Sequence, residues 1–112
     1  IVGIIDRYLE HARIFQFCAA GEDKMFIGSA DWMPRNLNNR VEVVTPVYSP
    51  NIKRDLATVI DYALRDTSQG RVVDGTGRND SWTTKANEPA FRSQEALYEH
   101  YKTEEESNKC QE

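Results

Sequence analysis

Several features are scarce in this 112-residue sequence, and each scarcity excludes a class of protein. The two cysteines, Cys18 and Cys110, show no Cys-x-x-Cys or Cys/His spacing, so we expect reduced thiols rather than a structural zinc site. No apolar run approaches the roughly 20 residues of a membrane span, and no signal peptide is visible. The formal net charge of -4 argues against a nucleic-acid-binding domain, although a local basic pocket could still hold phosphates.

The remaining composition is typical of one small soluble domain. Hydrophobic residues make up 39% and charged residues 29%, and the length suits a single domain over residues 1–112. The sequence opens at Ile1 without an initiator Met, so we expect a fragment of a longer protein. The residues after Thr103 are acidic and polar, and we expect residues 103–112 to form a disordered tail.

The pattern of apolar and turn-forming residues predicts alternating helices and strands. Ser49 followed by Pro50 is a good helix start, and Leu56 begins an apolar stripe that runs to Leu64. This order predicts a mixed α/β (α+β) layer fold. The expected helices cover residues 1–10, 31–38 (as a short helix or turn), 50–66 and 93–102. The expected strands cover residues 13–19, 25–29 (joined to the first by a turn at 21–24), 40–47, and weakly 71–73 and 82–84.

Candidate chemistry is concentrated in residues 10–43. If residues 11–13 start a strand, the side chains of His11 and Arg13 share a face, and Arg40 and Glu42 do so in the same way. An imidazole can exchange protons near neutral pH, and guanidinium groups hold phosphate oxygens, so these types suit phosphoryl or phosphodiester chemistry.

Plainer interpretations stay open for the same residues. A lone His11 is more often a surface residue than a catalyst, and Arg40 with Glu42 can be a solvated ion pair. Trp32 and Met33 are more often core residues than ligand contacts, and Asp31 can simply cap a helix. The residues alone support no more than an α/β domain with a candidate anion site.

The run His-x-Arg, then a hairpin, then Ile-Gly-Ser-Ala-Asp resembles half of the phospholipase D motif, His-x-Lys-x4-Asp followed by Gly-Ser-x-Asn. The sequence departs from that motif at Arg13, where the motif has lysine, at Cys18, where it has aspartate, and at Asp31, where it has asparagine. These departures argue against an ordinary phosphodiesterase.

The same departures match one branch of that superfamily. DRYLEHARIFQF (residues 6–17) and IGSADWMPRNLNNRVEVVTPV (residues 27–47) closely resemble the C-terminal domain of bacterial polyphosphate kinase. The similarity continues weakly through residues 51–66 and 94–97, whereas residues 67–92 match poorly. The resemblance implies a phospholipase-D-like mixed sheet flanked by helices.

The resemblance also implies an activity. Polyphosphate kinases reversibly transfer the terminal phosphate of ATP to polyphosphate through a phosphohistidine, which lies on a preceding domain. This domain would line the ATP and polyphosphate pocket and be inactive alone. His11 would assist proton transfer and Arg40 would contact ligand phosphates. Arg13 and Arg35 would either help to bind phosphates or form ion pairs within the domain. Ser29 and Asp31 would order the loop.

The resemblance extends to cofactors and partners. The family uses Mg²⁺ with ATP, and we expect no metal site in this domain alone. Expected partners are ATP, ADP, polyphosphate, the preceding domains and further copies of the full-length chain, but no nucleic acid. Expected localisation is the bacterial cytoplasm, with room for peripheral membrane association of the parent. Two alternatives stay open: a degenerate phospholipase-D-type phosphodiesterase half, and a non-catalytic structural module.

Overall fold

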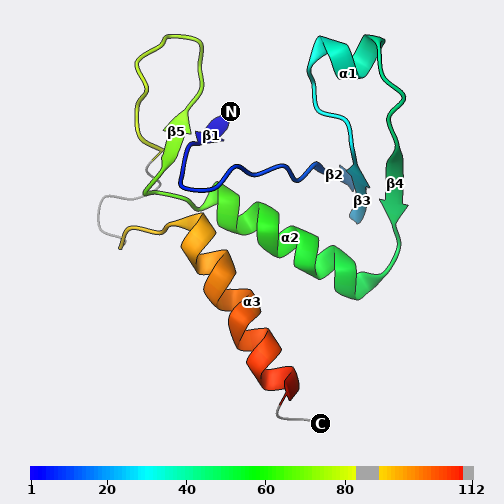
Figure 1. Ribbon diagram of the computed structural model, residues 1–112, viewed down its shortest axis with the longest axis vertical. Helices are drawn as coiled ribbons and strands as arrows, with labels where there is room; N and C mark the ends of the chain where they lie inside the picture. The colour runs from blue at the N-terminus through cyan, green and yellow to red at the C-terminus, as the bar shows by residue number, and fades with distance from the viewer. Residues whose placement is uncertain (83–88, 110–112) are drawn as a thin grey trace. The chain divides into compact units, whose positions relative to one another are not determined.

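A computed structural model of the chain describes residues 1–82 and 89–109 (Figure 1). The chain forms two compact units: unit 1 comprises Ile1–Leu9 and Val59–Glu112, and unit 2 comprises Glu10–Thr58. Helix α2 (Pro50–Leu64) contributes residues to both units, so this division leaves the single domain over residues 1–112 a prediction.

Unit 2 contains a three-stranded antiparallel sheet in the order β2-β3-β4. Strands β2 (Ile14–Ala19) and β3 (Glu22–Gly28) form the predicted hairpin. The turn is Ala20-Gly21, with φ of 50° and 93°, and is therefore tighter than the predicted turn at residues 21–24. Positive φ at both central residues is the geometry that matches the right-handed twist of a two-residue hairpin.

The third strand of unit 2 is shorter than the sequence predicts. Strand β4 covers Val44–Val47, and residues 40–43 form no strand. Short helix α1 (Pro34–Asn38) precedes it, as expected. Met25 and Val47 are paired across β3 and β4, and they are the buried hydrophobic side chains of the described chain. The core of unit 2 is therefore small.

Several apolar side chains that the sequence assigns to a core lie in solvent instead. Trp32 is 82% exposed and Met33 is 40% exposed, so the prediction that they are core residues is wrong. Both lie in the loop between β3 and α1, where no described residue covers the Trp32 ring. Cys18, on β2, is also exposed, and Cys110 lies outside the described residues.

The N-terminus of unit 1 is a strand, not the predicted helix over residues 1–10. Strand β1 (Val2–Ile4) pairs antiparallel with β5 (Gly70–Val72), with Val2 opposite Val72. The spacing of apolar residues there fits a helix, but the branched side chains also suit a strand, and pairing with β5 decides between them. Beyond β5, the predicted strand at 82–84 reduces to a bridge from Arg71 to Ser81; Thr83 and Thr84 lie outside the described residues.

The two long helices follow the sequence closely. Helix α2 begins at Pro50, and the Ser49 carbonyl accepts the Lys53 N–H at 2.9 Å. Helix α3 covers Ser93–Lys109, so residues 103–109 are helical where the sequence predicts a disordered tail. Among the described residues, no helix has the length and apolarity that a membrane crossing requires. The α+β fold class is confirmed, and both sheets of the described chain are antiparallel.

Asp66 is the structural centre of unit 1. Its side chain is fully buried and accepts five hydrogen bonds, from the amides of Ser68, Gln69 and Gly70 and from the amide and hydroxyl of Ser93. Burial raises the pKa of Asp66, but the hydrogen bonds from Ser93, Gln69 and Gly70 outweigh it, so the net pKa lies below the ordinary value. The carboxylate thereby joins the end of α2 to the start of α3.

A second carboxylate fastens the N-terminal segment to α3. Arg92 donates to both oxygens of Asp6, and the Asp6 side chain is only 2% exposed. One residue into α3, the Gln94 amide exchanges two hydrogen bonds with the backbone of Tyr8, at 2.9 and 2.7 Å. These contacts hold residues 6–8 in place without regular secondary structure.

Candidate functional site

All four predicted site residues belong to unit 2. His11 and Arg13 precede β2, Arg35 lies on α1, and Arg40 follows α1. The predicted strand alternation is wrong at both places, because β2 begins at Ile14 and β4 at Val44. Loop hydrogen bonds, rather than a shared strand face, therefore position these residues.

Arg13 forms an ion pair within unit 2. Its Nη2 lies 2.7 Å from Oδ2 of Asp31, and the two side chains are 14% and 23% exposed. The other nitrogen, Nη1, donates to the backbone carbonyl of His11. Of the two roles that the sequence left open for Arg13, the intradomain ion pair is the one seen.

Asp31 gathers donors from three directions. Besides Arg13, it accepts the Met33 amide at 2.9 Å and the side-chain amide of Asn36. The hydrogen bond from the Met33 amide and the guanidinium of Arg13 hold the pKa of Asp31 below its ordinary value. Asp31 is not the predicted helix cap, since the N-cap position of α1 is Met33, which has no side-chain cap bond. Asp31 instead closes a turn onto the amide two residues ahead.

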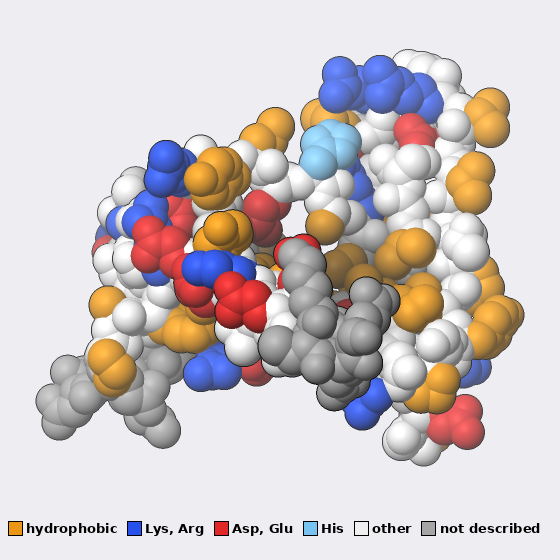
Figure 2. Space-filling model, turned by 60° about the horizontal axis from the view of Figure 1, so that its bottom comes forward, with side chains coloured by type: hydrophobic (Ala, Val, Ile, Leu, Met, Phe, Trp, Pro, Cys, Tyr) orange, Lys and Arg blue, Asp and Glu red, His pale blue; other side chains and the backbone are white. Residues whose placement is uncertain are grey.

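Asn36 links this carboxylate to Arg40. The Asn36 side chain is buried, with 6% exposure, and its Oδ1 accepts a hydrogen bond from Nη1 of Arg40 at 3.4 Å. Arg13, Asp31, Asn36 and Arg40 thus form a continuous chain of hydrogen bonds, which we call the arginine network. Arg40 is its exposed end. Figure 2 shows Lys and Arg side chains gathered at the upper right of its view.

The side chains of the other two predicted residues, His11 and Arg35, do not take part in the arginine network. The His11 imidazole and the Arg35 guanidinium are exposed, and within residues 1–82 and 89–109 neither forms a hydrogen bond or an ion pair. The predicted site residues of unit 2 therefore present one imidazole and two guanidinium groups to solvent, while the charge of Arg13 is compensated by Asp31. Guanidinium groups without a carboxylate partner are the ones able to take up phosphate oxygens.

Gly28 and Ser29 close the strand end beside the network. At Gly28 the backbone lies close to another segment of the chain. A Cβ at Gly28 would lie 3.0 Å from the carbonyl oxygen of Val43. Ser29 donates its hydroxyl to Glu42 and exchanges bonds with the backbone of Val43. Ser29 thus orders the segment after Arg40.

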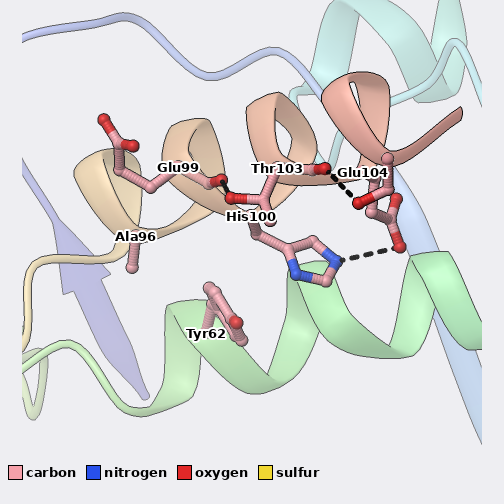
Figure 3. Close-up of a pocket in the computed structure, with 7 residues that line it drawn as sticks. Tyr62, Ala96, Glu99, His100, Thr103 and Glu104 are labelled. Atoms are coloured by element: carbon pink, nitrogen blue, oxygen red, sulfur yellow. Dashed lines mark hydrogen bonds and ion pairs between the residues drawn. The ribbon is translucent and has the colours of Figure 1, made fainter. Parts of the chain in front are cut away.

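The second histidine, His100, lies in a different setting (Figure 3). It lines a groove of about 550 Å³ in unit 1, and its ring lies 5.8 Å from the ring of Tyr62. Its Nε2 lies 3.7 Å from a carboxylate oxygen of Glu104, and Glu99 lines the same groove. Two carboxylates make this groove a poor place for phosphates, so His11 is the better candidate for the phosphate chemistry.

The arrangement of carboxylates offers no metal cage in the described part of the chain. No group of three metal-ligating side chains occurs there. In unit 2, Asp31 is occupied by Arg13 and Asn36, and Glu42 is occupied by Ser29. These residues do not fit a dedicated magnesium site.

Two structurally central residues were not singled out from the sequence, Asn36 and Asp66. Asn36 had a weak signal, because it lies in the expected helix or turn over residues 31–38, shortly before Arg40. Asp66 accepts local amides from Ser68, Gln69 and Gly70, but its other partner, Ser93, comes from a distant part of the chain. Contacts of that kind cannot be read from local spacing.

We expect the pKa of Asp31 to rise when Arg13 is replaced by glutamine. In the wild type, stability from the ionised Asp31 is present above the unfolded-state pKa of about 3.9 and is lost as pH falls through the lower folded-state pKa. Carbon-13 NMR titration of the carboxyl groups measures the change. Arg54→Gln is the control, because Arg54 donates to Asn51 and not to Asp31. An unchanged Asp31 midpoint in Arg13→Gln would contradict the ion pair.

Together these features define an α+β domain that presents cationic side chains from a hydrogen-bonded loop, a class suited to anionic ligands. Comparison with known proteins identifies the family. The model for polyphosphate kinase C-terminal domain 2 matches residues 1–94. The chain therefore belongs to the polyphosphate kinase family, as this C-terminal domain.

Individual relatives agree with this assignment. A polyphosphate kinase of Escherichia coli O6:H1 is 38% identical over 106 residues, which is 95% of this chain and 15% of that protein. A polyphosphate kinase of Rhodopirellula baltica is 42% identical over 98 residues, which is 88% of this chain and 12% of that protein. A crystal structure of polyphosphate kinase from Porphyromonas gingivalis matches with a TM-score of 0.83 and 36% identity, covering 95% of this chain and 16% of that one. The chain thus spans less than a fifth of the length of these relatives.

Proposed function

We propose that this chain works as the C-terminal part of a polyphosphate kinase, which reversibly transfers the terminal phosphate of ATP to polyphosphate through a phosphohistidine on another domain. In this proposal the chain lines the ATP and polyphosphate pocket and is inactive alone. The observation that carries it is the arginine network, which ends in an exposed Arg40 without a carboxylate partner in the described chain. Phosphoryl transfer depends mostly on positioning and on neutralising spread negative charge, and a held guanidinium supplies both.

His11 takes the assisting role in this proposal. Its imidazole is exposed next to the network, and its backbone carbonyl is held by Arg13. An imidazole in reach of phosphate can accept a proton in its neutral form and donate one in its protonated form near neutral pH. Arg35, one residue before Asn36 on α1, adds a second free guanidinium for phosphate oxygens.

Magnesium enters with the phosphates of ATP in this proposal. Mg²⁺ commonly keeps several waters and binds through one or two carboxylates together with substrate phosphates. Since Asp31 and Glu42 are occupied by other groups, this chain would contribute cations to the phosphates and no ligands to the ion. When bound, the ion would neutralise charge on the transferred group.

The apolar side chains in solvent support packing against preceding domains of the parent. Ile1, Leu9 and Val41 are each more than 90% exposed, and Trp32 is 82% exposed. In the parent, these side chains are available for contact with such domains. The proposal has three further parts, which rest on the family resemblance alone. They are the formation of homo-oligomers, a location in the bacterial cytoplasm and peripheral membrane association of the parent.

The test is polyphosphate synthesis from ATP by the full-length kinase that carries this domain. We expect His11→Ala and Arg40→Ala each to lower activity by about a hundredfold or more, since positioned acid–base groups and charge contacts contribute that much. Matched controls are His100→Ala, whose histidine lies in the acidic groove of unit 1, and Arg78→Ala, whose arginine pairs with Asp74 and Asp80.

Circular dichroism confirms that each variant is folded. Full activity of both His11→Ala and Arg40→Ala would contradict their proposed roles and support the alternative that this domain is a non-catalytic structural module of the kinase. A full-length protein that makes no polyphosphate would contradict the activity itself. Hydrolysis of a phosphodiester by the wild type would favour the phospholipase-D-type alternative instead.

A further inference from the structure

Asn36 lies between the two arginines of the network, and the two arginines have different partners. Arg13 lies against a carboxylate, so its positive charge is compensated within the domain. Arg40 lies against the neutral amide oxygen of Asn36, so its charge is left uncompensated by the network. One carboxylate therefore anchors both arginines, but it neutralises only the first.

The amide is the group that this position requires. Its nitrogen donates to the carboxylate of Asp31 while its oxygen accepts from Arg40. A carboxylate at position 36 would place two like charges side by side and would form an ion pair with Arg40. An apolar residue of similar size would leave Asp31 and Arg40 without these partners. The loss would fall at a buried position, since Asn36 is only 6% exposed.

The local backbone holds the amide in place. The Asn36 N–H donates to the Met33 carbonyl at 2.9 Å, and the Met33 N–H donates to Asp31 at 2.9 Å. The bond to Arg40, at 3.4 Å, is longer than these. Because the amide oxygen is neutral and uses only one N–H of Arg40, the remaining N–H groups of the guanidinium are available to an anion.

We infer that Asn36 is a positioning residue, which orients the Arg40 guanidinium toward a phosphoanhydride chain without neutralising it. The inference rests on the proposed function and deepens it. The shared ligand chemistry is a row of phosphate groups, which belongs to ATP or to polyphosphate. Michaelis constants measured separately for ATP in the forward reaction and for polyphosphate in the reverse reaction distinguish the two sources.

The test is a double-mutant cycle in the full-length kinase. We expect Asn36→Asp to lower kcat/KM by about tenfold or more, mainly through a higher KM, because the new carboxylate competes with phosphate for Arg40. In an Arg40→Ala background the same change should alter kcat/KM by less than about twofold, since the residue acts through Arg40. The matched control is Asn38→Asp, an exposed asparagine of the same helix that should keep wild-type constants.

A merely structural Asn36 gives a different result, namely the same fold-loss in both backgrounds. Additive effects, or wild-type constants for Asn36→Asp beside an impaired Arg40→Ala, would overturn the inference and leave the proposed function standing. Full activity of Arg40→Ala itself would refute the phosphate role of Arg40 and the inference with it. If Asn36→Asp does not fold, Asn36→Ser completes the cycle, since a hydroxyl is smaller and uncharged.

Discussion

Replacing Asp66 by alanine should destabilise unit 1 by about 3–5 kcal/mol, because several buried donors lose their acceptor together. The Asp66 carboxylate is fully buried and accepts five hydrogen bonds from Ser68, Gln69, Gly70 and Ser93. It also lies at the N-terminus of α3, where a negative charge is favoured by the helix dipole. A change of this size shifts the folding equilibrium by about two to three and a half orders of magnitude, at about 1.4 kcal/mol per tenfold change.

Amide hydrogen exchange localises the effect of Asp66→Ala. The amides of Ser68, Gln69, Gly70 and Ser93 should lose protection first, because each donates to the missing carboxylate. Asp61→Ala is the matched control: Asp61 is 58% exposed and pairs with Arg65, so its loss should cost less than about 0.5 kcal/mol in urea unfolding. Equal effects of the two substitutions would show that Asp66 is not the centre of unit 1.

Replacing Gly70 by alanine should cost about 2–4 kcal/mol for a steric reason. A Cβ at Gly70 would lie 2.2 Å from the backbone oxygen of Asp66 and 3.2 Å from Cβ of Trp82. Because the nearest atom belongs to the backbone, the chain has to move. The Gly70 amide donates to Asp66 and its carbonyl accepts from the Trp82 amide at 2.9 Å, so movement weakens both bonds.

A second glycine separates this steric cost from a conformational one. A Cβ at Gly75 would meet nothing within 4 Å, but the backbone there has φ of 79°. Gly75→Ala should therefore cost about 1 kcal/mol from backbone strain alone. Urea unfolding of both variants makes the comparison, and a larger loss for Gly75→Ala than for Gly70→Ala would contradict the close approach.

The network around Arg40 and the contacts of Asp66 follow one physical rule. In each, a carboxylate in a loop satisfies backbone amides and a side chain that comes from another segment. Such carboxylates stabilise irregular backbone, here the loop before α1 and the connection after α2. Helix α1, which carries Arg35, and the residues up to Arg40 are thus held by hydrogen bonds rather than by apolar packing.

Local sequence determined the elements whose signals are local. The hairpin of β2 and β3, the start of α2 at Pro50 and the start of α3 at Ser93 all agree with the predictions. Residues 6–17 and 27–47 also carried the family resemblance, because long motifs preserve residue types irrespective of their contacts. The candidate residues His11, Arg13, Arg35 and Arg40 came from those motifs, and their roles remain predictions.

Only the tertiary structure decided the features that depend on distant partners. The apolar spacing of residues 1–10 predicted a helix, but pairing of Val2–Ile4 with Gly70–Val72 makes a strand. Trp32 has a large apolar side chain of the kind found in protein cores, yet no residue in the described part of the chain covers it. The difference between Arg13 and Arg40 depends on whether a carboxylate or an amide lies opposite each guanidinium. Sequence spacing reports periodicity along the chain, whereas burial and charge compensation are set by which segments meet in space.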